Sequence, residues 1–269
     1  MASNRDHALN VDRLATTVSG PESAVPRRSS ARSARVAGTA ALALSLALSL
    51  ASGAAWSAQP APAQSERKPG ESDVSHWNRD AFAAYERDDN ALALSLYEKA
   101  ARAGDPSAKY NLAVMRVRGE TVRPSIPDAV RLLRQSAAAG FAPAQFMLGA
   151  MLDRGQYVPR SSVEATRWLS LAAEQGHPEA AFALALQYYL GRGVAQDYAL
   201  AARWYEKAAE ADDVAAQYIL ASMYEQGLGV AANVETALRW YVAAARQGDV
   251  VAREKAKELA ARLAREHDS

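Results

Sequence analysis

Apolar and small residues recur along the chain with a period of 36 residues. Segments 176–211 and 212–247 align without a gap. Under this shift the matched pairs are Ala180 with Ala216, Tyr188 with Tyr224, Gly191 with Gly227, and Trp204 with Trp240. A fixed period between about 20 and 50 residues is typical of a solenoid, in which each repeat is one small structural unit. The pattern therefore predicts a repeat architecture.

Each 36-residue unit has the spacing of two helices. Ala180, Leu184 and Tyr188 are four residues apart, so they share one face of a first helix. Gly191 and Gly193 end that helix, because glycine readily adopts the backbone angles of a tight loop. Apolar residues return at helical spacing over 201–208, which predicts a second amphipathic helix. One such hairpin cannot cover its own apolar face, so we expect the units to stack and share a core.

The period extends to four full units over 105–248. The residues that open successive units are Gly104, Gly140, Gly176, Asp212 and Gly248. Segment 73–104 keeps the register but lacks the glycine loop, so we expect a capping unit with a short turn near Asp88–Asn90. Segment 249–269 becomes heavily charged, as a terminal capping helix needs. The predicted fold is an all-α solenoid, a right-handed superhelix of helical hairpins.

The motif within the repeat resembles a known family. The stretch AAFALALQYYLGRGVAQDYALAARWYEKAA, from Ala180 to Ala209, resembles the Sel-1-like repeat, a relative of the tetratricopeptide repeat. The resemblance is looser over 140–175, where Tyr157 replaces the second loop glycine, and loosest over 104–139, where Leu132–Leu133 replaces the Trp–Tyr pair. Segment 73–104 is more similar to an ordinary tetratricopeptide unit. The resemblance implies a non-enzymatic adaptor that assembles protein partners.

The N-terminal region has the pattern of an export signal. Segment 1–35 is basic, and segment 36–58 holds an apolar run followed by small residues. Cleavage after Ala54 or Ala55 is one interpretation, and an uncleaved membrane anchor is the other. Because the basic region is long, a translation start at Val25 is a further hypothesis. Segment 59–72 is predicted to be a disordered linker. Both interpretations place the repeats in the periplasm of a bacterial cell envelope, free or anchored to the inner membrane.

Composition narrows the possible chemistry. The chain has 269 residues, a formal net charge of +1 and no cysteine, which excludes disulfides and a cysteine nucleophile and implies no overall attraction to nucleic acid. Its four histidines are scattered, so no metal site is predicted, and we also expect no cofactor. His177 is interpreted as a solvated turn residue. Gly191 and Gly193 recur once per unit after a helix, which favours a structural role over phosphate binding. No catalytic residues are predicted.

A partner-binding groove is expected on the first helices of the units, which line the concave side of such solenoids. Assigning the positions equivalent to 180, 182, 184 and 188 to the core leaves those equivalent to 183, 187 and 190 for the groove. The groove residues proposed on this basis are Asn111, Met115, Arg118, Met147, Met151, Arg154, Ala183, Gln187, Leu190, Ile219, Met223 and Gln226. Methionine adapts to varied surfaces, which suits contact with a peptide segment.

Two functions follow as hypotheses. The first is a protein–protein interaction scaffold in the cell envelope, which binds an unidentified protein segment in the groove. The alternative is an exported protein that binds or hydrolyses peptidoglycan. A pair of acidic residues in the groove and turnover of cell-wall fragments would favour the alternative, whereas co-purification of a stoichiometric protein would favour the scaffold.

Overall fold

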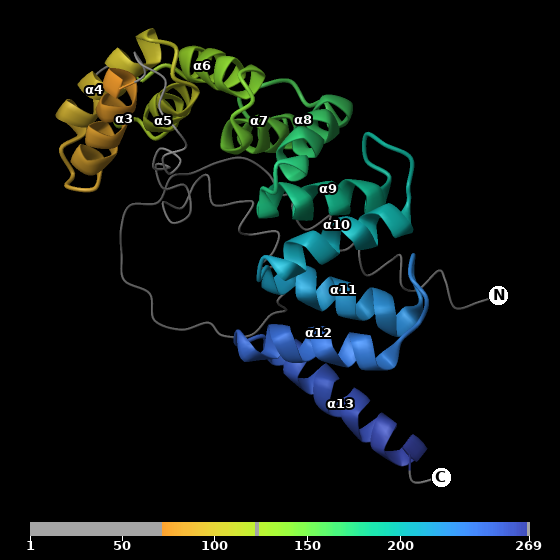
Figure 1. Ribbon diagram of the computed structural model, residues 1–269. Helices are drawn as coiled ribbons and strands as arrows, with labels where there is room; N and C mark the ends of the chain where they lie inside the picture. Colours follow the sequence, from red (N-terminus) through yellow and green to blue (C-terminus); the bar gives the residue numbers. More distant parts are fainter. Residues whose placement is uncertain (1–71, 122–123, 268–269) are drawn as a thin grey trace, which may run out of the picture.

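The computed structural model describes residues 72–121 and 124–267, which contain eleven helices and no strand (Figure 1). The helices are α3 (Ser72–Tyr85), α4 (Asn90–Arg102), α5 (Pro106–Val117), α6 (Ile126–Ala138), α7 (Ala142–Arg154), α8 (Ser162–Glu174), α9 (Pro178–Leu190), α10 (Tyr198–Glu210), α11 (Val214–Gln226), α12 (Val234–Arg246) and α13 (Val250–His267). None of these helices is long and apolar enough to cross a membrane. The predicted basic segment, export signal and nearly all of the linker lie outside the described residues.

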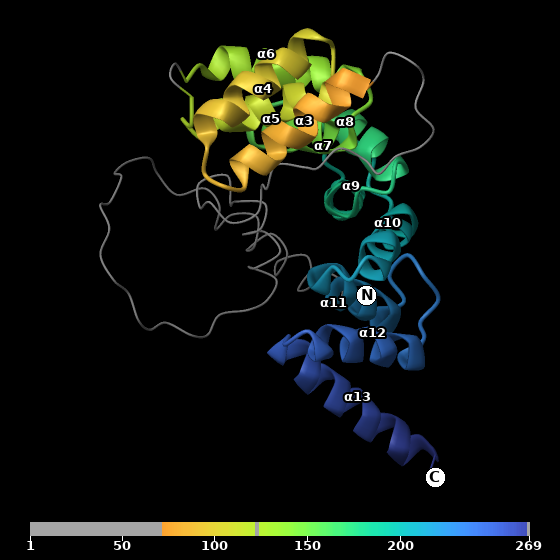
Figure 2. The ribbon, with the colours of Figure 1, turned by 60° about the vertical axis from the view of Figure 1, so that its left-hand side comes forward.

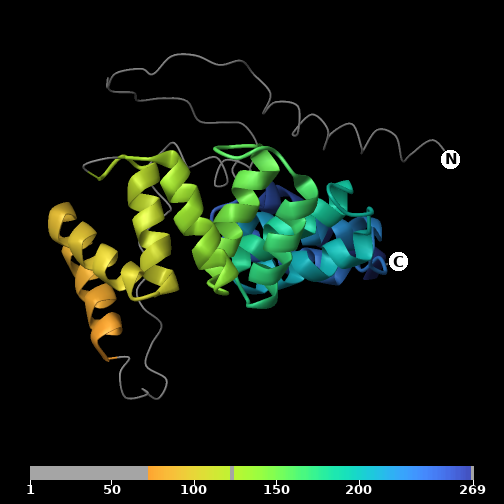
Figure 3. The ribbon, with the colours of Figure 1, turned by 90° about the horizontal axis from the view of Figure 1, so that it is seen from above.

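Each helix packs mainly on the helices that precede and follow it in the chain. The pairs α5–α6, α7–α8, α9–α10 and α11–α12 form the hairpins of the four predicted units. Figure 1 shows the hairpins following an arc from α3 to α13, and Figure 2 shows α9 to α13 stacked below the earlier helices. Seen from above, α3 and α4 lie at one end of the array (Figure 3). The all-α solenoid predicted from the period is confirmed.

The second helix of every hairpin begins at a polar residue whose side chain caps it. Asp89, Ser125, Ser161, Asp197 and Asn233 each accept a hydrogen bond from the backbone N–H three residues later, at 2.7–3.4 Å. Such caps satisfy backbone donors that have no partner within the helix. They fix where each second helix starts, and therefore the length of the loop before it.

The glycine loops hold successive hairpins together. Gly155, Gly191 and Gly227 end α7, α9 and α11 in the left-handed conformation. Two residues later Gly193 has a φ of 69°, and a Cβ atom there would overlap the backbone carbonyl of Ser162 at the start of α8. Only glycine fits so close an approach. The loop between α9 and α10 thus rests directly on the hairpin before it (Figure 1).

The core is built largely from alanines, with a large residue at intervals. Tyr97, Tyr205 and Tyr241 are fully buried, as are the leucines of the first helices. Trp204 and Trp240 are half-buried and pack against the core clusters. At the N-terminal end, α3 and α4 join through a short turn in which Asp88 has a φ of 60°. At the other end, α13 takes the place of the first helix of a further unit.

Candidate partner-binding surface

The inner face of the arc is formed by the first helices of the hairpins. In Figure 1, α5 and α7 lie on the hollow side, with α6 and α8 outside them. α7 also contacts α9, two helices further along the chain. On α9, the residues that retain exposure along this face are Glu179, Phe182, Leu186 and Leu190. We call these four positions and their equivalents in the other units the inner stripe.

The structure corrects half of the predicted groove. Six of the proposed residues are at most 3% exposed and belong to the interior: Asn111, Met115, Met147, Met151, Gln187 and Met223. The error arises from the helical period. Position 187 lies three residues after Leu184 and seven after Ala180, so it shares their buried face. Neither the adaptable methionines nor Gln187 is therefore available to a partner.

The other predicted positions keep some exposure. Arg118 and Gln226 are exposed, whereas Arg154 and Ile219 are half-buried, as are Ala183 and Leu190. The positions equivalent to 190 thus belong to the inner stripe, and those equivalent to 183 lie at its edge. Sequence reasoning missed position 182, because its bulky side chains were assigned wholly to the core. Position 182 lies three residues after 179 and four before 186, so it shares a helix face with 179, 186 and 190. This spacing is the one signal in the sequence that could have indicated partial exposure.

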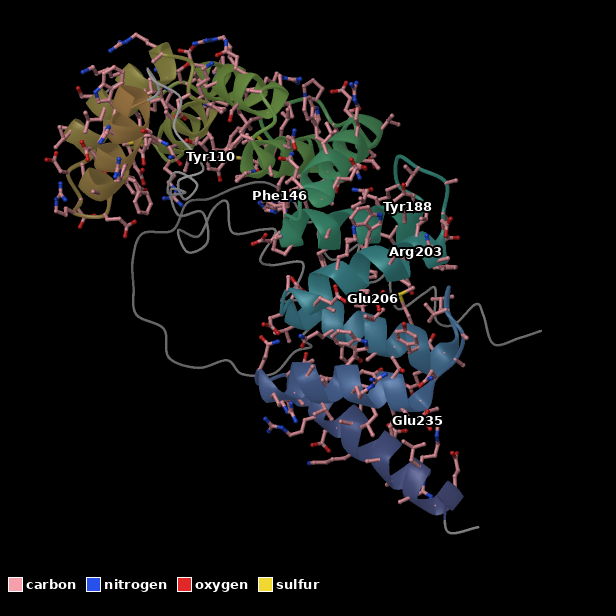
Figure 4. The ribbon with its side chains drawn as sticks, viewed as in Figure 1. Tyr110, Phe146, Tyr188, Arg203, Glu206 and Glu235 are labelled. Atoms are coloured by element: carbon pink, nitrogen blue, oxygen red, sulfur yellow. The ribbon has the colours of Figure 1, made fainter. Side chains whose placement is uncertain are left out.

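The inner stripe is open in the second half of the array and closed in the first. Tyr110 and Val114 of α5 are buried, whereas Phe182 and Leu186 of α9 are half-buried. Figure 4 shows Tyr110 and Phe146 on the hollow side of the arc. The ring of Tyr110 packs edge-on against Phe141, with 5.4 Å between their centroids. The curvature in this part of the array leaves little room for a partner.

The pKa of Tyr110 reflects its burial on the inner side. Burial raises the pKa of Tyr110, Arg118 lowers it, and Glu179 raises it further. Tyr110 lies on α5 and Glu179 on α9, two units apart. The approach of the first helices on the inner side is shown by the contact between α7 and α9.

His177 is a capping residue and not the solvated turn residue that was predicted. Its ring stacks on Phe146 with 4.8 Å between centroids, and its side chain is only 15% exposed. Nδ1 of the ring accepts a hydrogen bond from the N–H of Ala180. The same Nδ1 lies 3.1 Å from Oε2 of Glu179. The hydrogen bond from His177 holds the pKa of Glu179 below its usual range.

Glu179 and Asp213 are acidic residues at the starts of α9 and α11, and Glu179 is one of the groups that raise the pKa of Asp213. Burial raises the pKa of Asp213, while a hydrogen bond from the N–H of Ala216 lowers it. Asp213 is the cap of α11, and Glu179 is engaged by His177. Both carboxylates therefore have structural roles, and the pair gives no support to hydrolysis of cell-wall material. Across 72–121 and 124–267, no cluster of His, Asp or Glu could hold a metal ion.

The outer face carries a shallow groove between α8 and the loop that follows α9. Its volume is about 360 Å³. One wall is formed by residues of α8, namely Val163, Thr166, Arg167, Ser170 and Leu171. The other wall is formed by Gly193 and Val194 of the loop. We call this the α8 groove. No pattern in the sequence predicts this groove, because it depends on how closely the loop approaches the neighbouring hairpin.

Comparison with known proteins identifies the repeats. The family described as Sel1 repeat matches residues 84–105, 106–141, 142–177, 178–213 and 214–249. The partial match over 84–105 lies in the segment that was predicted to be a tetratricopeptide-like cap. No curated protein matches the chain significantly.

Solved structures show the same fold. A Sel1 repeat protein from Oxalobacter formigenes is 32% identical with a TM-score of 0.62, and the match covers 70% of this chain and 79% of that one. The protein c5321, a protective antigen present in uropathogenic Escherichia coli strains, is 30% identical with a TM-score of 0.57. That match covers 59% of this chain and 34% of c5321, so the chain spans about a third of the length of that protein. The chain belongs to the Sel1 repeat family.

Proposed function

We propose that this protein is a non-enzymatic scaffold that binds a segment of a partner protein in the bacterial cell envelope. Sel1 repeat proteins are generally protein-interaction scaffolds, which supports the first part of the proposal. The basic segment 1–35 and the apolar segment 36–58 support the second, because their order is that of an export signal or membrane anchor.

The proposal is supported by a difference in location: residues that repeat between units are structural, whereas residues of the inner stripe vary between units. Residues that recur every 36 positions are buried, cap helices or form loops, such as Ala180, Leu184 and Gly191. Residues of the inner stripe differ between units: Glu179 corresponds to Ala215, and Leu186 to Ser222. A scaffold with a constant core and a variable surface is suited to recognise one partner by complementarity.

The test of the scaffold must leave the core intact. Met147→Glu with Met151→Glu would place two charges in the interior and unfold the protein, so this pair is not informative. Leu186→Glu with Leu190→Glu changes the half-buried inner stripe instead. Ala199→Glu, on the exposed outer side of α10, is the matched control.

The experiment is crosslinked capture from an envelope fraction with the full chain as bait. The scaffold proposal expects a stoichiometric protein that is captured by the wild type and the control, and that is lost from the inner-stripe variant while the circular dichroism spectrum is unchanged. If no protein is captured in stoichiometric amount, the scaffold proposal is rejected. If a protein is captured equally by all three, the inner stripe is not the binding surface.

Localisation has its own test. Cells that express the full chain are separated into cytoplasmic, periplasmic and membrane fractions, and the protein is detected in each. The proposal expects it in the periplasm or in the membrane fraction, exposed to protease added to spheroplasts. Recovery in the cytoplasm alone would contradict the envelope assignment without affecting the scaffold proposal.

A further inference from the structure

The α8 groove exposes apolar side chains that the fold does not need on its surface. Val163 is 69% exposed and Leu171 is 37% exposed, although both lie on a helix whose other apolar residues are largely covered. They are eight residues apart and thus lie on one side of α8, two turns from each other. Val194 of the loop after α9 lines the opposite wall. The result is an apolar groove open to solvent.

The same place in the next unit is not apolar. Shifting by 36 residues replaces Val163 with Ala199, Ser170 with Glu206 and Leu171 with Lys207. Figure 4 shows Glu206 on α10 beside Arg203. The backbone arrangement is common to both units, since Gly229 approaches Tyr198 of α10 just as Gly193 approaches Ser162 of α8. The apolar lining at α8 is therefore a property of this unit and not of the repeat.

The wall of the groove opposite Val194 is held in place before any partner binds. The hydroxyl of Thr166 donates to the carbonyl oxygen of Ser162 at 2.9 Å and to that of Arg192 at 3.3 Å. The second bond joins α8 to the loop after α9, and the close approach of Gly193 fixes the same contact. A preformed groove lowers the entropy lost on binding.

Arg167 supplies the single charge of the lining. It lies between Val163 and Leu171, one turn from each, and is exposed. In the described part of the chain it has neither a hydrogen bond nor an ion pair. Glu164 and Glu174 lie on the same helix, and Glu174 accepts a hydrogen bond from Ser170 instead. A guanidinium flanked by apolar side chains is complementary to a carboxylate flanked by aliphatic groups.

We propose that the α8 groove binds a segment of the partner protein in which aliphatic side chains flank an acidic residue, with the carboxylate paired to Arg167. The proposal rests on the scaffold function and adds to it a second contact surface, on the outer face, together with the chemistry of the segment that it recognises.

The direct test uses two peptides and the full chain labelled at the methyl groups of valine and leucine. The probes are acetyl-Leu-Glu-Leu-Leu-amide and the same peptide with lysine in place of glutamate. At millimolar peptide the proposal expects the glutamate probe to shift the methyl signals of Val163, Leu171 and Val194, and to bind about tenfold more tightly than the lysine probe, since a charge-assisted bond is gained. Absence of these shifts, or equal binding of both probes, would overturn it.

Charge reversal gives the matched control. Arg167→Glu should invert the preference, so that the lysine probe binds more tightly than the glutamate probe. Arg203→Glu makes the same change at the equivalent position of α10 and should leave the preference unaltered. If Arg203→Glu acts as strongly as Arg167→Glu, the effect is general electrostatics and the proposal fails.

The same two variants separate this proposal from the scaffold function. If Arg167→Glu captures the stoichiometric protein as well as the wild type does, the scaffold stands and the α8 groove is not part of its interface. If the wild type captures no protein, the scaffold function falls, and the peptide titration still decides whether the groove binds such a segment.

Discussion

The loops of the third and fourth units differ from that of the second, although all three begin at an equivalent glycine. Gly193 and Gly229 press against the carbonyls of Ser162 and Tyr198, so close that a methyl group would not fit. At the same place in the second unit stands Tyr157, with a φ of 63° and a side chain that is 44% exposed. The backbone angle is preserved although glycine is not.

This difference separates two constraints that glycine usually satisfies together. The first constraint is the left-handed backbone conformation of the loop, which a tyrosine can adopt at a cost of about 1 kcal/mol. The second constraint is the close approach of the loop to the neighbouring hairpin, which leaves no space for any side chain. The second unit accepts the first cost because its loop is not pressed on the preceding hairpin in the same way, as the exposure of Tyr157 indicates. The α8 groove lies where the close contact begins.

The largest expected effect comes from adding a methyl group at the close contacts. Gly193→Ala or Gly229→Ala should destabilise the protein by about 3 kcal/mol, because backbone strain and overlap with a carbonyl act together. Tyr157→Gly should change stability by less than about 1 kcal/mol, since relief of strain offsets the lost side-chain contacts. Urea unfolding of the full chain, followed by helical circular dichroism, measures both. Equal effects at 157 and 193 would show that the loops do not differ.

The interior positions equivalent to 187 allow a comparison of the two halves in which Met and Gln are exchanged. They hold Met115, Met151 and Met223 but also Gln187, whose Oε1 is buried without a hydrogen bond. Met151→Gln should destabilise the first half by about 2 kcal/mol, because it buries an amide that no partner satisfies. Gln187→Met should stabilise the second half by about 1 kcal/mol. Thermal unfolding of the two variants should move the midpoint in opposite directions, and a lower midpoint for Gln187→Met would indicate that the amide has a role in the fold.

A third pair of variants should show no difference between the halves. Gln145 donates to the carbonyl of Ala137 at 3.1 Å, and Gln217 donates to that of Ala209 at the same distance. Gln145→Ala and Gln217→Ala should each cost about 1 kcal/mol, since each carbonyl keeps a backbone donor. Urea unfolding midpoints would test the equality. A difference between the two midpoints would contradict the prediction. It would show that the two hydrogen bonds contribute unequally to stability although their geometry is the same.

The smallest effect is expected from Asp213, whose pKa burial raises. A raised pKa means that the folded state carries an electrostatic penalty above that pKa, which is relieved as the pH falls toward the unfolded value of about 3.9. Asp213→Asn keeps the helix cap but removes the charge. The variant should be slightly more stable than the wild type at pH 7, and the gain should vanish near pH 3. A gain that persists at low pH would assign the effect to packing instead of charge.

The fold could be predicted from the sequence because its determinants repeat. Alanines, glycines and aromatic residues at a fixed spacing define the hairpins, their order and their caps. The structure has a turn between α3, which ends at Tyr85, and α4, which begins at Asn90, and a final helix over Val250–His267. These features depend on local spacing, which the chain displays directly.

The binding surface could not be predicted equally well, because it depends on which flank of a helix its neighbours leave uncovered. Met151 and Gln187 are polar enough or adaptable enough for a surface, yet neighbouring helices cover both. Phe182 is bulky enough for the core, yet it keeps some exposure. The α8 groove could not be predicted, because it depends on the close backbone approach of Gly193 to Ser162. These residues are 31 positions apart, and no spacing in the sequence indicates that they meet.

The buried glutamines carry one further implication, for the construction of longer arrays. Gln145 receives a hydrogen bond from Gln175, and Gln217 receives one from Gln247. The intervening unit has Ala181 and Ala211 at these places, so the polar connection recurs two units later and not in the next unit. Because each of these bonds lies within one hairpin, 142–177 or 214–249, a designer who extends this protein can add single hairpins without breaking the amide connection.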